Sequence, residues 1–383
     1  MALIPVLGSR ILCPFCFKYI STKSLLYLCQ NAKCMDSPTL GGHIIASAKP
    51  DREGFCTCDK CSRTTSTKVC PECKTVLPHT ITESPTRIIS IVGASSSGKS
   101  YYVGSVLRKI MDEGLFSELQ FDDIERISTI WADKKSPTEY SKRFKSLMDN
   151  FRILNPTEKI TDIVKDNPPL LIEMSIERKR LEHSTFSFFD AAGESFHDAS
   201  DLAAITPYIA HSEAVILILD PRQIPKVNSD ITAAIPGLPA VSTVTYSEIL
   251  NNAIQIIRND KRLSRNKKIK IPLCIAFSKW DLVMETPNLI PDGLICGQSS
   301  QQVNDGYDEQ RIDSISNEIR SLLMQQWSEA NLVALAEQNF ETVKYFSFSA
   351  WGSSNSGKNG APPIASFRVE DPLLWVLHKN KVI

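Results

Sequence analysis

The sequence has no excess of charge of either sign, because 43 Lys and Arg residues balance 43 Asp and Glu residues. A balanced chain offers no broad electrostatic field to nucleic acid or to a membrane surface. Long apolar stretches are also missing: the longest strongly apolar run, Ala214 to Leu219, falls far short of the roughly 18 residues that a membrane span needs. No basic stretch with a long apolar core opens the chain, so we expect no signal peptide.

Cysteine is scarce over most of the chain. Nine of the 11 cysteines lie between Cys13 and Cys73, and only Cys274 and Cys296 lie elsewhere. A secreted disulfide protein would not leave about 300 residues of ordinary globular composition almost without bridges. Clustered Cys-x-x-Cys pairs in such a chain indicate metal sites in a reducing compartment, so the sequence predicts a cytoplasmic protein. At 383 residues, the chain is long enough for two or three domains.

Eight of these cysteines form four closely spaced pairs, which predict two four-cysteine zinc sites, because each short turn offers two sulfurs to one tetrahedral ion. Pairs that are adjacent in the chain are expected to share an ion, with one ribbon over residues 1–47 and a second over residues 48–84, or one fused pair. The predicted ligands are Cys13, Cys16, Cys29 and Cys34 in the first set and Cys58, Cys61, Cys70 and Cys73 in the second. Cys56 is an alternative to Cys58, and the spacing alone also fits iron–sulfur ligation.

The charge of this module leaves its partner open. Up to Thr86 it has ten basic and six acidic residues, and eight metal-bound thiolates would cancel that excess. Nucleic-acid binding is therefore only weakly supported, and docking to a protein is at least as well supported.

A phosphate-binding loop follows the Cys-rich module. The β-branched run Arg87 to Val92 predicts a buried strand, and Tyr101 to Met111 predicts a helix. Between them, Gly93-Ala-Ser-Ser-Ser-Gly98-Lys99-Ser100 satisfies the P-loop pattern, in which backbone N–H groups surround phosphates at the positive end of a helix. Lys99 is expected to reach the β- and γ-phosphates and Ser100 to ligate Mg²⁺. The predicted nucleotide-binding residues here are Gly93, Ala94, Ser95, Ser96, Ser97, Gly98, Lys99, Ser100 and Tyr101.

The P-loop does not choose between ATP and GTP, but later segments do. Ile271 to Phe277 predicts a core strand that leads into Ser278-Lys279-Trp280-Asp281, similar to the guanine-reading box Asn-Lys-x-Asp. A carboxylate at Asp281 would accept hydrogen bonds from N1–H and the 2-amino group of guanine, which adenine cannot offer. Lys279 would pack along the base, and Ser278 replaces the usual Asn. A last strand ends in Ser349-Ala350-Trp351, similar to the loop that contacts the guanine O6.

Catalytic positions are predicted from a further strand, Thr185 to Phe189, which ends in Asp190-Ala-Ala-Gly193. Asp190 would hold Mg²⁺ through water, and the Gly193 amide would sense the γ-phosphate. Glu194 stands where many GTPases have a water-orienting Gln, and a carboxylate beside a polyanion is repelled unless a cation counters it. Slow intrinsic hydrolysis, completed by a partner or a dimer, is therefore expected. The switch threonine is either Thr157 or Thr161.

The order and strand context of these boxes are those of a GTPase of the TRAFAC class. We therefore expect an α/β fold over residues 85–383, with a Ras-like, mostly parallel sheet, helices on both faces, and insertions at about 113–168 and 222–268. Helices are expected near Phe121 to Trp131 and near Glu139 to Asn150. The expected cofactors are GTP or GDP, Mg²⁺ and two Zn²⁺. The alternatives are a P-loop ATPase or kinase, and a scaffold that binds GTP but barely hydrolyses it.

The whole chain resembles the bacterial double-GTPase proteins, a TRAFAC branch encoded in paired GTPase operons. The likeness rests on the boxes above, on Cys13-Pro-Phe-Cys-Phe with the later Cys70-Pro-Glu-Cys, and on the ending Arg368-Val-Glu-Asp-Pro-Leu-Leu-Trp375. This resemblance implies a partner GTPase and a role in bacterial conflict, such as defence against phage.

Overall fold

A computed structural model describes most of the chain. The described residues are 10–37, 40–45, 49–121, 123–149, 167–190, 199–297, 307–352 and 366–383. The predicted site residues Thr157, Thr161, Gly193 and Glu194 lie outside these ranges. None of the helices in the described ranges is long and apolar enough to cross a membrane.

A seven-stranded sheet in the order β14-β13-β12-β8-β11-β10-β9 forms the centre of the larger domain. Its strands are β8 (Thr86–Gly93), β9 (Arg126–Trp131), β10 (Leu170–Glu177), β11 (Leu181–Asp190), β12 (Ala214–Leu219), β13 (Leu273–Phe277) and β14 (Val343–Ser347). The five strands β8, β11, β12, β13 and β14 are mutually parallel, whereas β10 pairs antiparallel with both β11 and β9. The predicted α/β fold with a mostly parallel, Ras-like sheet is confirmed, and β9 extends one edge.

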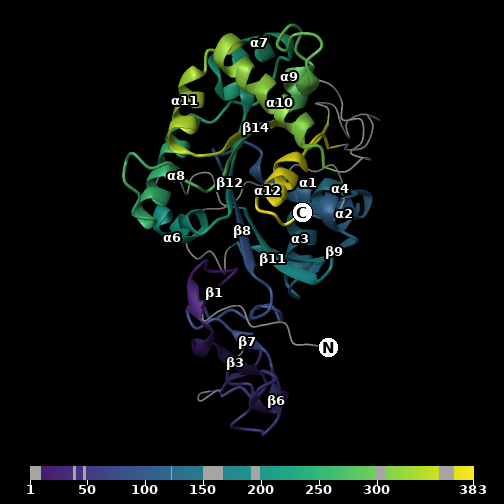
Figure 1. Ribbon diagram of the computed structural model, residues 1–383, viewed down its shortest axis with the longest axis vertical. Coiled ribbons are helices and arrows are strands. Elements are labelled where there is room, and N and C mark those ends of the chain that lie inside the picture. The colour runs from purple at the N-terminus through teal and green to yellow at the C-terminus, as the bar shows by residue number, and fades with distance from the viewer. Residues whose placement is uncertain are drawn as a thin grey trace.

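Helices cover both faces of this sheet, as Figure 1 shows. They are α1 (Lys99–Met111), α2 (Leu115–Glu118), α3 (Ser136–Tyr140), α4 (Ser146–Asp149), α6 (Ala199–Ala210), α7 (Pro225–Ala234), α8 (Tyr246–Asp260), α9 (Trp280–Met284), α10 (Glu309–Ser321), α11 (Ala330–Asn339) and α12 (Asp371–Lys379). Residues of α6, α7, α8 and α11 build one core cluster, and residues of α1, α4 and α12 build the other. The sheet therefore separates two hydrophobic cores.

The sequence pattern explains the central strands better than the edge. Every residue of β12 is buried, as a continuous apolar run predicts for a strand covered on both faces. The predicted helix near Phe121 to Trp131 is wrong, because Arg126–Trp131 is strand β9, in which Ile127 alone is buried and the other five residues are partly or fully exposed. β-branched residues with period-two alternation favour a strand on the sheet edge. The prediction near Glu139 is confirmed, where α3 and α4 flank a π-helical turn, Ser141–Lys145.

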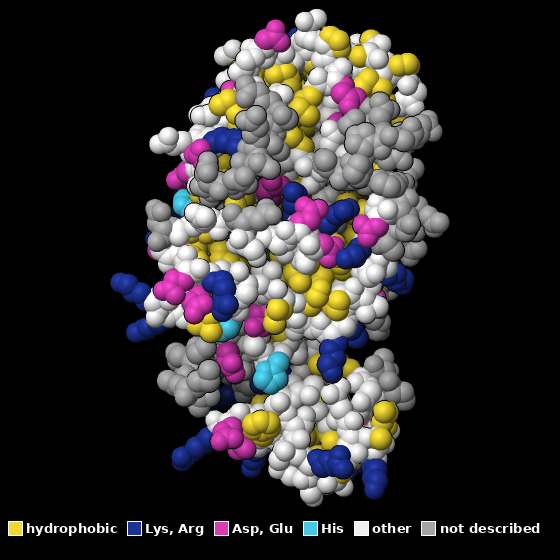
Figure 2. Space-filling view, turned by 90° about the vertical axis from the view of Figure 1, so that its right-hand side faces the viewer, with side chains coloured by type: hydrophobic (Ala, Val, Ile, Leu, Met, Phe, Trp, Pro, Cys, Tyr) yellow, Lys and Arg dark blue, Asp and Glu magenta, His cyan; other side chains and the backbone are white. Residues whose placement is uncertain are grey.

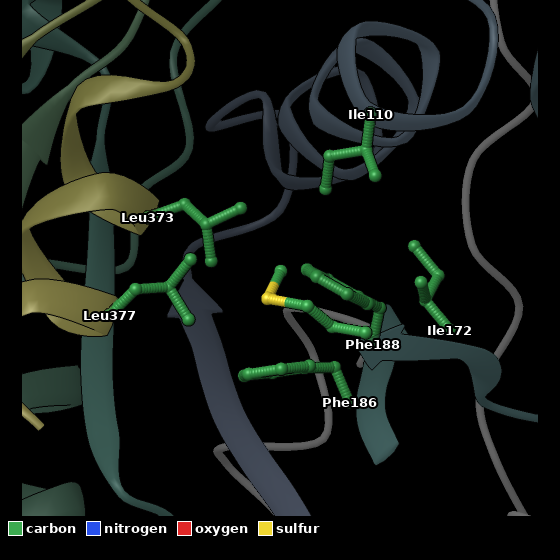
Figure 3. A pocket seen from close by; sticks show the side chains of 7 residues that line it. Ile110, Ile172, Phe186, Phe188, Leu373 and Leu377 are labelled. Atoms are coloured by element: carbon green, nitrogen blue, oxygen red, sulfur yellow. The ribbon is translucent and has the colours of Figure 1, made fainter. Parts of the chain in front are cut away.

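The C-terminal helix α12 packs beside α1 on the second core. Figure 3 shows Leu373 and Leu377 of α12 and Ile110 of α1 facing Phe186 and Phe188 of β11 across a small gap. Every side chain that lines the gap is apolar. Because nothing there can fix a polar ligand, we interpret this gap as imperfect packing rather than as a functional site.

The Cys-rich module lies at one end of the long axis of the molecule (Figure 1). It consists of short strands: β1 (Arg10–Leu12), β2 (Tyr19–Ser21), β3 (Leu26–Cys29), β4 (His43–Ile44), β5 (Cys56–Thr57), β6 (Thr64–Thr65) and β7 (Lys68–Val69). Strands β1 and β2 form a hairpin, β5 and β6 form another, and β3 lies between β4 and β7. The pairing of β3 with β7 joins the first half of the module to the second half.

Candidate functional site

The predicted nucleotide-binding segments meet at one edge of the sheet. Strands β8, β11, β12, β13 and β14 are parallel, so their carboxyl ends lie together. Those ends lead into Gly93, Asp190, Asp220, Ser278 and Ser349. Ligands of open α/β sheets bind at this edge, where loops and helix N-termini converge.

The P-loop runs from the end of β8 into α1 with two glycines that a larger residue could not replace. A Cβ on Gly93 would lie 2.4 Å from the carbonyl oxygen of Ile218. Gly98 caps α1 with a φ of 98°, in the left-handed region that favours glycine. The sequence therefore places the N-terminus of a 13-residue helix directly after a tight loop, which is the arrangement that binds phosphate.

Lys99 is folded over the P-loop and is only 6% exposed. Its Nζ donates to the carbonyl oxygens of Gly93 at 3.0 Å and Ala94 at 2.8 Å. Burial lowers the pKa of Lys99 to about 8, against the raising effect of the carboxylate of Asp190. A buried ammonium group is costly without a charged partner, so phosphate oxygens bound at this loop would stabilise the charge of Lys99.

Asp190 ends strand β11 and is 3% exposed. Arg143 Nη2 lies 3.8 Å from its Oδ2 atom, and Asn167 Nδ2 donates to its backbone carbonyl at 2.6 Å. Sequence reasoning did not find Arg143 or Asn167, because neither belongs to a recognised box. Asp190 ends β11, and Ser100 lies in the first turn of α1, which follows the neighbouring strand β8. Both offer oxygen ligands of the kind that Mg²⁺ takes.

The predicted base-reading end contains a buried carboxylate with a fixed orientation. Asp281 is 7% exposed, and its Oδ1 accepts a 2.6 Å hydrogen bond from the hydroxyl of Ser349. Burial raises the pKa of Asp281, while this hydrogen bond acts in the opposite direction. Two segments that are 68 residues apart in sequence are thus joined at one carboxylate.

Ser278 and Lys279 connect this end to the P-loop. The Ser278 hydroxyl donates to the carbonyl of Ser97 at 2.6 Å, with the carbonyl of Leu219 at 3.0 Å as a second neighbour. Lys279 Nζ donates to the carbonyl of Ser96 at 2.9 Å and pairs with Asp220 Oδ2 at 2.5 Å. A serine can therefore tie the base-reading strand to the phosphate loop with its own hydroxyl.

Asp220 is a part of the site that sequence reasoning missed. Its carboxylate is buried and pairs with both Arg222, at 2.7 Å, and Lys279. Burial alone would raise the pKa of Asp220, but Lys279 and Arg222 outweigh it and the pKa is lowered. Its position directly after β12 was the available signal. Asp220 therefore holds Lys279 in place, two residues before Asp281.

Aromatic residues flank the site. The rings of Tyr101 and Trp351 pack with centroids 5.8 Å apart, and Ala350 beside them is buried. Trp280, between Lys279 and Asp281, is fully buried and donates from Nε1 to the carbonyl of Cys296 at 2.7 Å. Trp280 occupies the variable third position of the Ser278-Lys279-Trp280-Asp281 box, and its burial therefore anchors this loop in the core.

Comparison with known proteins agrees with this geometry. The model of the family described as Double-GTPase 2 matches residues 87–349. The chain belongs to the Double-GTPase 2 family. The matched range begins in β8 and ends at Ser349, so this Double-GTPase 2 domain includes every described segment of the nucleotide site except Ala350 and Trp351.

The Double-GTPase 2 chain is similar to proteins of several organisms. "Putative ESX-1 scaffolding and assembly protein SaeC" of Mycolicibacterium smegmatis is 23% identical over 326 residues, which are 81% of this chain and 79% of that protein. The structure of the Arl6 BBS3 small GTPase from Trypanosoma brucei with bound GppNp is 10% identical in sequence and has a TM-score of 0.28. That match covers 78% of this chain and 98% of the Arl6 chain. The structure of sup35 complexed with GDP is 13% identical in sequence and has a TM-score of 0.26. That match covers 71% of this chain and 39% of the sup35 chain. The chain thus spans only about two fifths of sup35, and scores this low do not bear on function.

The cysteines in front of the Double-GTPase 2 domain form two groups, each able to hold a metal ion. The groups are Cys13, Cys16, Cys70 and Cys73, and Cys29, Cys34, Cys58 and Cys61. The two groups together contain all eight predicted ligands, and Cys56 belongs to neither group. The prediction that pairs adjacent in the chain share an ion is wrong, because each group joins one pair from the first half of the module to one pair from the second half. Strand β3 pairs with β7, so the two halves of the module share one sheet and their ligands interleave.

Sulfur–sulfur distances within the groups fit a tetrahedral ion. The Sγ pairs Cys13–Cys73 and Cys16–Cys70 are both 3.9 Å apart, Cys29–Cys61 is 3.6 Å, and Cys34–Cys58 is 3.9 Å. Metal–sulfur bonds of about 2.3 Å in a tetrahedron separate the sulfurs by about 3.8 Å. The donor set therefore suits zinc without rearrangement.

The first cysteine group rests directly on the Double-GTPase 2 domain. Phe17, which follows Cys16, is fully buried, with ring centroids 5.1 Å from Tyr208 of α6 and 5.7 Å from Phe189 of β11. Its backbone carbonyl accepts a 2.7 Å hydrogen bond from His211. The Tyr208 hydroxyl accepts from the Ile91 amide at 2.7 Å, within the P-loop strand. The Cys-rich module thus contacts β11, which ends in Asp190, and is linked through Tyr208 to β8, which ends in the P-loop.

The face shown in Figure 2 carries Lys, Arg, Asp and Glu side chains interspersed along its length. Among its described residues no broad area has a single sign of charge. On this face positive and negative side chains are mixed, as the equal numbers of basic and acidic residues in the sequence predict.

Proposed function

We propose that the chain is a GTP-binding and GTP-hydrolysing switch whose Mg²⁺ is held by Ser100 and Asp190. The observation that carries this proposal is the buried carboxylate of Asp281, oriented by Ser349 at the sheet edge that also carries Lys99. A carboxylate accepts from the N1–H and 2-amino groups of guanine, whereas adenine presents an acceptor at N1. The wider P-loop ATPases and kinases do not need such a group.

The proposal assigns two Zn²⁺ ions to the interleaved cysteine groups. Their closed four-thiolate sets leave no open position for chemistry, so the ions would stabilise a docking module. Because Phe17 packs on Phe189 and Tyr208, a change at Asp190 on binding of the γ-phosphate would change how this module is held. Cysteines that are held in metal sites and form no disulfides suit a reducing compartment, and the proposed compartment is the cytoplasm.

A partner completes the proposed switch, and it is either a second GTPase or a second copy of the chain. Gly193, Glu194 and the switch threonine, Thr157 or Thr161, are assigned to catalysis on their sequence positions. Glu194 is a poor water-orienting group beside a polyanion, so hydrolysis is expected to depend on what a partner adds. Participation in bacterial conflict is proposed on the family resemblance.

Turnover of GTP by metal-replete protein tests this proposal. We expect slow hydrolysis, on the order of 10⁻² s⁻¹ or less, as for GTPases without an external activator. If the chain activates itself as a dimer, the rate per molecule rises with protein concentration; if a second GTPase is needed, it stays constant until that partner is added. Fast turnover at low concentration would contradict the proposed partner dependence.

A scaffold that binds GTP and barely hydrolyses it is the second candidate. Glu194 favours it, and so does the description of the similar SaeC protein as a scaffolding and assembly protein. A single-turnover experiment separates the two: a scaffold leaves radiolabelled GTP intact over hours at saturating protein, whereas a switch converts it to GDP and phosphate.

A further inference from the structure

Arg143 projects into the nucleotide site from outside the recognised boxes. It lies in the π-helical turn Ser141–Lys145, inside the expected insertion at 113–168. Its Nη2 lies 3.8 Å from Asp190 Oδ2, and its Nη1 donates to the carbonyl of Pro168 at 3.1 Å. Its side chain is 18% exposed, so the guanidinium is largely withdrawn from water. π-helical turns of this kind are frequent at functional sites.

The turn is held firmly against the P-loop helix. Phe144 and Met148 pack on Gly104 of α1, where a Cβ would lie 2.9 Å from the Phe144 ring. Tyr140 donates to Asp112 at the end of α1 at 2.8 Å, and Lys145 pairs with Asp112 at 2.9 Å. Gly104 lies one helical turn beyond Ser100. This packing therefore holds Arg143 near Ser100 and Asp190, the two proposed Mg²⁺ ligands.

Asp190 interacts with two cations: Arg143 Nη2 lies 3.8 Å from its Oδ2, and its charge opposes the burial that lowers the pKa of Lys99. When Mg²⁺ arrives with the nucleotide, a divalent ion competes with the guanidinium for this carboxylate, and the triphosphate brings several negative charges within reach. A guanidinium has five N–H donors in a planar fork that matches phosphate oxygens. The charge that develops on the phosphate during transfer is the charge that an arginine stabilises in other GTPases.

We infer that Arg143 is an arginine finger supplied by the chain itself, which moves from Asp190 to the phosphates when Mg·GTP binds. This inference rests on the proposed function. Water orientation, for which Glu194 is a poor group on its sequence position, still limits the rate. Arg143 therefore adds charge stabilisation in the transition state and little to the binding of GDP.

Binding of GDP with and without aluminium fluoride, which mimics the transferring phosphoryl group, tests the inference without relying on turnover. We expect wild-type protein alone, with Mg²⁺, to bind GDP more tightly by about 100-fold when aluminium fluoride is present. Arg143→Met removes the guanidinium, whose Cζ lies 4.9 Å from the centroid of the Phe144 ring, but keeps an unbranched side chain. It should lose that gain, with GDP affinity changed by less than about threefold. Arg143→Lys keeps the charge without the fork and should recover only part of it.

Lys142→Met is the matched control, because Lys142 is the exposed neighbour in the same turn. It should behave as wild type. An Arg143→Met protein that retains the full aluminium fluoride effect would overturn the inference, as would a wild-type protein that lacks the effect without a partner. Wild-type protein that binds no GDP at all would instead overturn the proposed function.

Discussion

Replacement of Lys99 by Met is expected to weaken Mg·GTP binding by about 1,000-fold. The buried ammonium would make two or more charge-assisted hydrogen bonds to phosphate, each contributing about 1.5–3 kcal/mol, and about 4 kcal/mol corresponds to a factor of 1,000. Lys99 is 6% exposed and burial already disfavours its charge, so folding should tolerate the loss. Calorimetric titration of GTP measures the affinity, and thermal unfolding measures the stability.

Lys109→Met is the matched control for Lys99. Lys109 lies on the same helix α1, where it pairs with Glu113 at 3.1 Å, away from the P-loop. This variant should bind GTP like the wild type. Equal GTP affinity in Lys99→Met and wild-type proteins would show that the nucleotide does not contact this loop.

Replacement of Cys70 by Ser is expected to remove one of the two metal ions and to release the Cys13–Cys16 turn. Cys70 is fully buried in the first cysteine group. Metal binding supplies much of the folding free energy of such small modules, on the order of 10 kcal/mol for one structural zinc. Loss of the ion should also loosen Phe17 from Tyr208 and Phe189. Elemental analysis of the metal content measures the first effect.

Thiol labelling then distinguishes the interleaved arrangement from two sequential ribbons. In Cys70→Ser protein, Cys13, Cys16 and Cys73 should react with an alkylating reagent, while Cys29, Cys34, Cys58 and Cys61 stay protected. Reaction of Cys58, Cys61 and Cys73, with Cys13 and Cys16 protected, would contradict the interleaved grouping. Cys56→Ser is the matched control, because Cys56 is buried but lies outside both groups and both ions should remain.

Local sequence patterns predicted the parts of the fold that local physics decides. The all-apolar run of β12 and the glycine-to-helix transition at Gly98 were recognisable because burial and backbone conformation act within a few residues. Parallel strands bring Asp190, Asp281 and Ser349 to one edge of the sheet, and the 2.6 Å hydrogen bond from Ser349 to Asp281 agrees with that expectation.

Long-range packing decided what the sequence did not reveal. All four Cys pairs look alike locally, so only the pairing of β3 with β7 determines which of them share an ion. Strand β9 has one buried residue and follows no apolar run, which made it resemble a polar helix. Arg143 reaches Asp190 only because Phe144 and Met148 pack on Gly104, a contact that no spacing in the sequence encodes.

Guanine recognition by Asp281 is tested most directly by calorimetric titration of GTP, GDP and ATP, each with Mg²⁺, into metal-replete wild-type and Asp281→Asn proteins. We expect the wild type to bind both guanine nucleotides and not ATP. In Asp281→Asn, an amide N–H₂ group faces the 2-amino group of guanine, so GTP affinity should fall by about 100-fold. Xanthosine triphosphate, which has an acceptor at that position, should bind the variant better than GTP does. Tight ATP binding that is indifferent to the substitution would contradict guanine recognition and return the chain to the wider P-loop ATPases.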